Sequence, residues 1–186
     1  MNQRTREAQG RLDGKDSKLR ERLTMADVYR VAGFHQGVIA GPIDEVWALV
    51  NDWGSLRWFD DGSNADGMKV MECWLDGEPD AVPRTRVMGR GDGAVELGAP
   101  KENREVLLVS DPVAHRLYYD ATDGFAEGIR NYIASWSFDK IDENSCSMTI
   151  TSTFDCVPGE VGEAQAAMLH QVYVAIVDSL DKYFRK

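Results

Sequence analysis

The side chains best suited to acid–base chemistry lie on three segments in the middle of the chain. Glu105 is a candidate general base, because a carboxylate in an apolar pocket can remove an acidic proton from a carbon beside a carbonyl group. Arg86 and Tyr132 are candidates for orienting such a substrate or for donating a proton to it. No fixed spacing connects these three residues, so they form a candidate catalytic set only if the fold brings them together.

Other kinds of site have little support in the sequence. The three histidines are isolated from one another, and an isolated histidine is more often a surface or core residue than a ligand. The three cysteines are unevenly spaced and form no C-x-x-C pair, so neither zinc nor a disulfide framework is indicated. We therefore expect no metal and no cofactor. The residues concerned are His35, His115, His170, Cys73, Cys146 and Cys156.

Length and composition favour one globular domain. The chain has 186 residues, of which 43% are hydrophobic and 28% charged, the balance of a folded protein rather than a disordered one. Its formal net charge of −10 would repel nucleic acid and anionic membranes, so we expect neither as a partner. We expect no transmembrane segment and no secretory signal, and a cytoplasmic location in which the cysteines stay reduced.

The first 24 residues differ from the rest in charge. They hold seven Lys or Arg and four Asp or Glu residues, which gives this segment a net charge of +3. A thin stripe of leucines runs along it, but an isolated helix of this length is marginal in water. We expect residues 1–24 to form a disordered or loosely helical basic arm and residues 25–186 to form the single domain.

The segment after the first predicted strand combines helix signals with a cluster of tryptophans. That strand is expected at residues 28–40. Pro42 suits the first position of a helix, and Asp44 and Glu45 lie in its first turn, where the helix dipole favours negative charge. Gly54 is expected to end this helix, and a second short helix follows. The cluster consists of Trp47, Trp53 and Trp58, whose large rings need a broad cover.

A run of short strands and one long helix make up the rest of the chain. The long helix is expected at residues 160–184, and a long amphipathic helix and an antiparallel sheet bury their apolar faces best when the sheet wraps the helix. The sequence therefore predicts an α+β fold, with about seven antiparallel strands curved around a C-terminal helix and two short helices after the first strand. Further strands are expected at residues 68–75, 83–88, 94–99, 104–110, 116–121, 131–139 and 146–154.

Several segments resemble one known superfamily. Gly41–Trp47 (GPIDEVW) and Asp52–Trp58 (DWGSLRW) are similar to the opening of the helix-grip proteins, also called START-like or SRPBCC proteins. Within them the chain looks like the polyketide cyclase/dehydrase group, which shares its fold with the birch pollen allergen. The resemblance covers residues 29–184. The other similar segments are Glu105–Asp111, Arg130–Tyr132 and Thr151–Phe154.

This resemblance implies a deep cavity between the sheet and the long helix, and it implies which strand faces line that cavity. It places Glu105 and Val109 inward, and it points the face that carries Arg84 and Arg86 inward as well. An inward arginine near Glu105 would form a polar cluster in an apolar pocket, as is common in small-molecule sites. The expected ligand contacts are Phe59, Arg84, Met88, Leu107, Tyr119, Trp136, Phe138, Met168, Val172 and Ile176.

The leading hypothesis is a protein that binds a small hydrophobic, polyketide-like or lipid molecule in this cavity, as a monomer or a weak homodimer. The alternative is a cyclase or dehydratase that uses Glu105, Tyr132 and Arg86 without a metal. A third reading, an interaction module without a ligand, treats the inward aromatic rings as plain core and the Glu–Arg cluster as a structural ion pair or a solvated rim. The abscisic acid receptors carry a pocket lysine where Phe59 stands, which speaks against a receptor of that kind.

Overall fold

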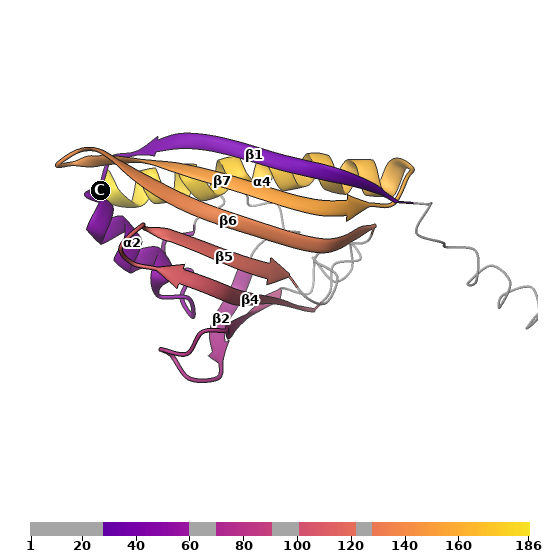
Figure 1. Ribbon diagram of the computed structural model, residues 1–186, viewed down its shortest axis with the longest axis horizontal. Coiled ribbons are helices and arrows are strands. Elements are labelled where there is room, and N and C mark those ends of the chain that lie inside the picture. The colour runs from indigo at the N-terminus through magenta and orange to yellow at the C-terminus, as the bar shows by residue number, and fades with distance from the viewer. Residues whose placement is uncertain (1–27, 60–69, 91–100, 122–127) are drawn as a thin grey trace, which may run out of the picture.

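The computed structural model describes residues 28–59, 70–90, 101–121 and 128–186 (Figure 1). The predicted strand at residues 94–99 and the predicted basic arm lie outside these described residues. The chain order places strand β1 first, then the short helix α2, six more strands and the long helix α4. The bounds are β1 Tyr29–Ile39, α2 Ile43–Asn51, β2 Val70–Asp76, β3 Arg84–Arg90, β4 Glu102–Asp111, β5 Arg116–Ala121, β6 Ile129–Asp142, β7 Ser145–Cys156 and α4 Glu160–Phe184.

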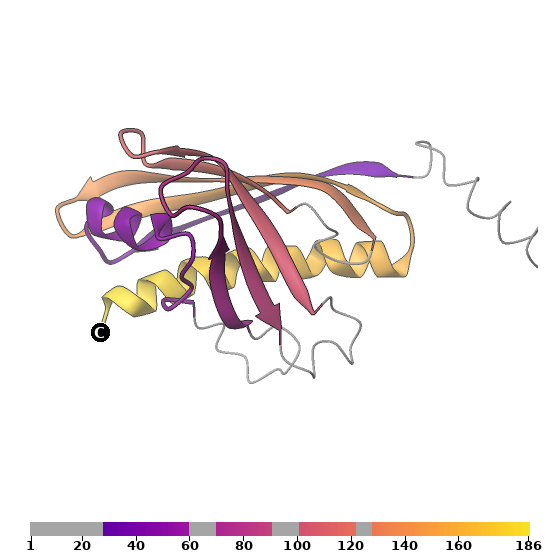
Figure 2. The same ribbon diagram turned by 90° about the horizontal axis from the view of Figure 1, so that it is seen from below.

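The seven strands form one antiparallel sheet that curves around α4. Their spatial order is β1-β7-β6-β5-β4-β3-β2, so β1 and β2 are the two edges. α4 lies along β1, β7 and β6, whereas β2, β3 and β4 run across its direction (Figure 2). This is the helix-grip fold that the sequence predicts. Neither α2 nor α4 is both long and apolar enough to span a membrane.

Two glycines on β1 allow α4 to approach the sheet closely. A Cβ atom on Gly33 would lie 2.8 Å from the ring of Tyr173, and a Cβ atom on Gly37 would lie 2.6 Å from the side chain of Val177. Carbon atoms do not pack at these distances, so a larger residue at either position would push the helix away. The glycines on β1 therefore determine how tightly α4 is held.

The end of α2 departs from the expectation. The helix ends at Asn51, and the described residues after it form turns instead of a second short helix, with Ser55 N–H donating to the Asp52 carbonyl at 2.9 Å. In a continuing helix Ser55 would donate to the Asn51 carbonyl. That oxygen instead accepts hydrogen bonds from the backbone N–H of Trp53 and from the guanidinium of Arg84, both at 2.8 Å. A tight local turn and a distant side chain thus occupy the acceptor that the next helical turn needs.

Strand β4 contains a second departure. Val109 was expected to point inward with Glu105, but its side chain is 44% exposed. The pairing of β4 with β5 shifts register between Leu107 and Val109, and such a bulge reverses the alternation of the residues beyond it. The inward face of β4 therefore ends at Leu107, which is completely buried.

Candidate functional site

Two opposite charges meet inside the curve of the sheet. Arg86 on β3 and Glu105 on β4 stand directly opposite each other in the strand register, and each residue is only 4% exposed. The Nε–H of Arg86 donates to Oε2 of Glu105 at 2.7 Å, and Nη2 of the same guanidinium also contacts this oxygen. The structure thus brings together two of the three candidate catalytic residues.

Trp53 covers this ion pair. The Cζ atom of Arg86 lies 3.7 Å from the centroid of the Trp53 ring, close enough for a cation–π interaction. The indole N–H of Trp53 donates to the backbone carbonyl of Glu105 at 3.3 Å. Tyr119 and Trp136 add two more rings around the guanidinium, each with its centroid 5.9 Å from Cζ. The pair is therefore enclosed by aromatic side chains and shielded from bulk water.

Arg84 has a different role from Arg86, although both arginines share one face of β3. Arg84 lies opposite Leu107, which is two residues from Glu105 along β4. Its side chain binds the end of α2. Its Nη2 donates to the carbonyl and to Oδ1 of Asn51 at 2.8 and 3.2 Å, and Ser110 donates to the same Oδ1 at 2.7 Å. Burial lowers the pKa of the Arg84 guanidinium. Arg84 is predicted as a ligand contact, and in the structure it fixes the end of α2.

Four buried hydroxyl groups form a chain across the interior. The hydroxyls of Tyr119 and Tyr132 lie 3.4 Å apart, those of Tyr132 and Tyr173 lie 3.0 Å apart, and that of Tyr173 lies 2.6 Å from Oγ of Ser152. Burial is the main reason why the pKa of each of the three phenols is raised, so all three stay protonated and neutral. The chain connects β5, β6 and β7 with α4, and two of its members, Tyr173 and Ser152, are not among the predicted site residues.

Five buried side-chain atoms in the described part of the chain have no hydrogen-bond partner. Four of them are N–H donors and one is an oxygen acceptor. The signal for one of them, Asn103, was present in the sequence, because it stands two residues before Glu105 in an alternating strand and so shares its face. The five atoms are Trp58 Nε1, Trp136 Nε1, Arg84 Nε, Asn103 Nδ2 and Gln165 Oε1.

The remaining predicted contacts differ in how deeply they are buried. Met88, Leu107 and Phe138 are buried, and the ring of Phe59 packs edge-to-face against Trp58 with centroids 5.8 Å apart. On α4, Ile176 is 7% exposed, whereas Met168 and Val172 are half-buried. The most deeply buried hydrophobic residues of α4 are Leu169, Tyr173 and Leu180.

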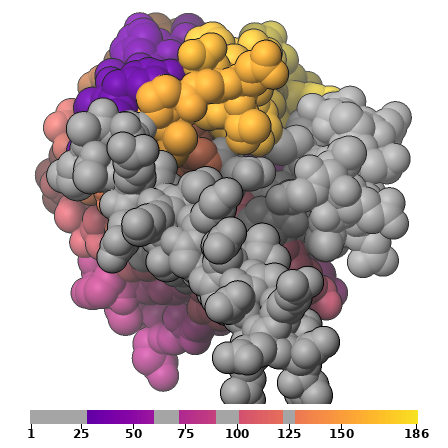
Figure 3. Space-filling view, turned by 90° about the vertical axis from the view of Figure 1, so that its right-hand side faces the viewer, coloured from indigo at the N-terminus to yellow at the C-terminus, as the bar shows by residue number. Residues whose placement is uncertain are grey.

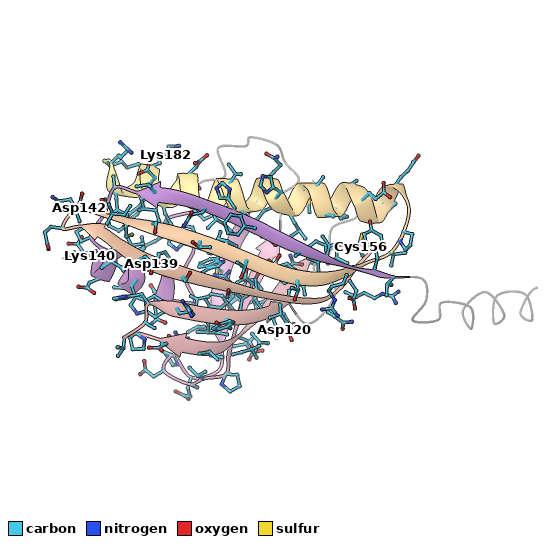
Figure 4. All side chains as sticks on the ribbon, turned by 45° about the horizontal axis from the view of Figure 1, so that its top comes forward. Asp120, Asp139, Lys140, Asp142, Cys156 and Lys182 are labelled. Atoms are coloured by element: carbon cyan, nitrogen blue, oxygen red, sulfur yellow. The ribbon has the colours of Figure 1, made fainter. Side chains whose placement is uncertain are left out.

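Charged side chains gather at one end of the sheet. Figure 4 shows Asp139, Lys140 and Asp142 together where β6 meets β7, at the opposite end of the sheet from Cys156. In Figure 3 the first turns of α4 lie above the magenta strands β2 and β3, at opposite sides of that face. The described residues contain no group of three or more His, Cys, Asp or Glu side chains that could hold a metal ion.

Comparison with known proteins agrees with this architecture. Residues 34–185 match the family model described as "Polyketide cyclase / dehydrase and lipid transport". The chain belongs to this family. A search of curated proteins finds no match to the sequence.

Solved structures from several organisms share the fold. A solution NMR structure from Thermobifida fusca is 25% identical, with a TM-score of 0.63 over 83% of this chain and 93% of that one. The protein XoxI from Bacillus cereus is 17% identical, with a TM-score of 0.66 over 84% and 96% of the two chains. Norcoclaurine synthase from Thalictrum flavum, solved with dopamine and hydroxybenzaldehyde, is 16% identical, with a TM-score of 0.62 over 84% and 87%.

Proposed function

We propose that this protein binds a small, largely apolar, cyclic molecule between the concave face of the sheet and α4. The observation that carries the proposal is the buried Arg86–Glu105 pair beneath Trp53. Removing two charges from water costs several kcal/mol per ion, and apolar residues of the same volume often serve stability equally well. A charged pair inside an aromatic enclosure is the arrangement by which small-molecule sites orient an otherwise apolar ligand.

The relatives support the same reading. The family description includes lipid transport, which is the binding of an apolar molecule. The norcoclaurine synthase structure shares this fold and was solved with two small aromatic compounds. On this proposal the ligand ring lies against Met88, Leu107 and Tyr119, with Ile176 of α4 on its other side. Arg84 acts indirectly, because it fixes the end of α2 and so the position of Trp53.

A larger side chain beside the ion pair tests the proposal. Ala121 on β5 stands opposite Glu105 in the register and is 7% exposed, so Ala121→Leu places three carbon atoms next to the pair. We expect the unmodified protein to bind the neutral fluorophore 6-propionyl-2-dimethylaminonaphthalene saturably in a fluorescence titration, and Ala121→Leu to weaken this binding at least tenfold. Ala32→Leu is the matched control, because Ala32 is exposed on β1. Equal binding by the Ala121 and Ala32 variants, or no saturable binding at all, would contradict the proposal.

A cyclase or dehydratase is the second candidate, and one feature of Glu105 favours it. Its Oε2 is bound by Arg86, whereas no described residue donates a hydrogen bond to Oε1, which leaves that oxygen available to accept a proton. Glu105 would remove a proton from a carbon between two carbonyl groups, and Arg86 would stabilise the enolate. Glu105 would then give this proton to the leaving hydroxyl, which departs as water, while Tyr132 and Tyr119, which stay protonated, would donate hydrogen bonds to it.

The variant Glu105→Gln distinguishes the two functions. It keeps the shape of the side chain but cannot act as a base. For an enzyme we expect turnover of a β-diketone thioester to be lost while its binding changes only a few-fold. For a binding protein the unmodified chain has no turnover to lose, and only affinity changes. Asp139→Asn, a change at an exposed carboxylate of β6, serves as the control.

A further inference from the structure

The interior has more hydrogen-bond donors than acceptors. Of the five buried and unpartnered polar atoms in the described segments, four are N–H groups. A buried donor without a partner destabilises the fold, so proteins keep few of them unless something else satisfies them. A ligand that satisfies these four donors must therefore offer acceptor oxygens.

Asn103 is the donor best placed to select such a ligand. It lies on the inward face of β4, opposite Met88 and two residues before Glu105, and it is 5% exposed. Its Nδ2 has no partner among the described residues. The terminal torsion of asparagine is broad, so the amide can turn to present its N–H group to a neighbouring molecule.

The neighbouring polar groups are less available. Arg86 directs both Nε and Nη2 at Glu105, and Trp53 covers one face of its guanidinium. The rings of Trp58 and Trp136 meet edge-to-face at 6.2 Å, an arrangement in which an indole N–H gains some compensation from an aromatic face. Arg84 is already held at the end of α2 through Nη2, so Asn103 is the unpartnered donor that lies on the Glu105 face of β4.

We propose that Asn103 determines specificity by donating a hydrogen bond to an uncharged carbonyl oxygen of a cyclic ligand. The amide of Asn103 is neutral and supplies no charge to offset the cost of bringing an anion out of water, so an uncharged carbonyl oxygen suits this position. This inference rests on the proposed function, since it names the chemistry of the ligand that the same site binds. It assigns Asn103 a role in recognition, separate from the residues proposed for catalysis.

Two probes that differ in one acceptor test this proposal. 2-Acetylnaphthalene carries a carbonyl oxygen, and 2-ethylnaphthalene has a similar shape without it. We expect the full chain to bind the ketone roughly tenfold more tightly than the hydrocarbon, as measured by isothermal titration calorimetry. In Asn103→Leu and Asn103→Ala this preference disappears, because the ketone loses its donor and the hydrocarbon loses nothing. In Gln36→Leu, a change at an exposed amide of β1, the preference stays.

Thermal unfolding gives an independent reading of the same variants. If the amide is kept for a ligand, it destabilises the empty protein, and Asn103→Leu raises the Tm by roughly 2–6 °C. An amide with a purely structural role would give a lower Tm instead, and that result would overturn the inference. Equal binding of ketone and hydrocarbon, or a preference that survives both Asn103 variants, would overturn the inference alone. Failure of both probes to bind would overturn the proposed function as well.

Discussion

The buried ion pair gives the strongest quantitative prediction of this structure. Replacing Arg86 by Met keeps most of the apolar volume beneath Trp53 but leaves the carboxylate of Glu105 inside an aromatic enclosure without its cation. Breaking a buried pair by removing one partner costs about 3–5 kcal/mol. Arg86 and Glu105 are each only 4% exposed, so the upper part of this range applies. We expect the Tm of Arg86→Met to fall by about 8–20 °C.

The double variant Arg86→Met/Glu105→Leu shows whether the loss comes from the unpaired charge. With both charges removed, the desolvation cost disappears for both partners, and such replacements are often neutral or stabilising. We therefore expect the double variant to recover most of the stability that the single variant loses. Urea unfolding followed by circular dichroism measures all four members of this double-mutant cycle. A double variant as unstable as Arg86→Met would refute the reasoning, because packing rather than charge would then explain the loss.

Three further variants test other parts of the fold. Gly33→Ala places a Cβ atom 2.5 Å from Oγ of Ser152 and 2.8 Å from the ring of Tyr173, so urea unfolding should show a loss of about 1–3 kcal/mol. Tyr173→Phe removes one hydrogen-bond partner from each of two buried hydroxyls, those of Tyr132 and Ser152, and should cost about 1–3 kcal/mol, whereas Tyr183→Phe on the exposed side of α4 should change little. The backbone N–H groups of Ala114 and Val113 lower the pKa of Asp111. The stabilisation that this carboxylate gives is therefore complete above the unfolded pKa of about 3.9 and is lost as the pH falls through the lower folded value. Asp111→Ala should be less stable than the unmodified chain at pH 6 and about equally stable at pH 2.

The sequence predicts the sheet and the long helix well because their patterns are local. Alternation alone places Tyr132 and Trp136 on the buried face of β6, and the helix predicted at residues 160–184 has the bounds of α4. The turns that stand in place of a second short helix could not be predicted in this way. The carbonyl of Asn51 accepts from the nearby Trp53 N–H and also from Arg84, which is 33 residues away in the chain.

In the candidate site too, features that depend on neighbouring residues could be predicted, and features that depend on distant segments could not. Alternation places Arg84 and Arg86 on one face, but only the register between β3 and β4 decides that Arg86 meets Glu105 and that Arg84 meets Leu107. Register depends on packing across the whole sheet, so the sequence of either strand alone does not predict it. Asn103 was missed for a different reason, because alternation shows only that it shares the face of Glu105, and its lack of a partner appears only in the folded chain.

The chain of four buried hydroxyl groups can be hydrogen-bonded in either of two directions. Each of its three contacts can be donated from either side, so the protons can all point toward Ser152 or all point toward Tyr119. When all three hydrogen bonds reverse, the Tyr119 hydroxyl changes between accepting from a guest and donating to it, and no heavy atom moves. A guest beside Tyr119 would thus meet walls of fixed shape and a terminal oxygen that adjusts to it.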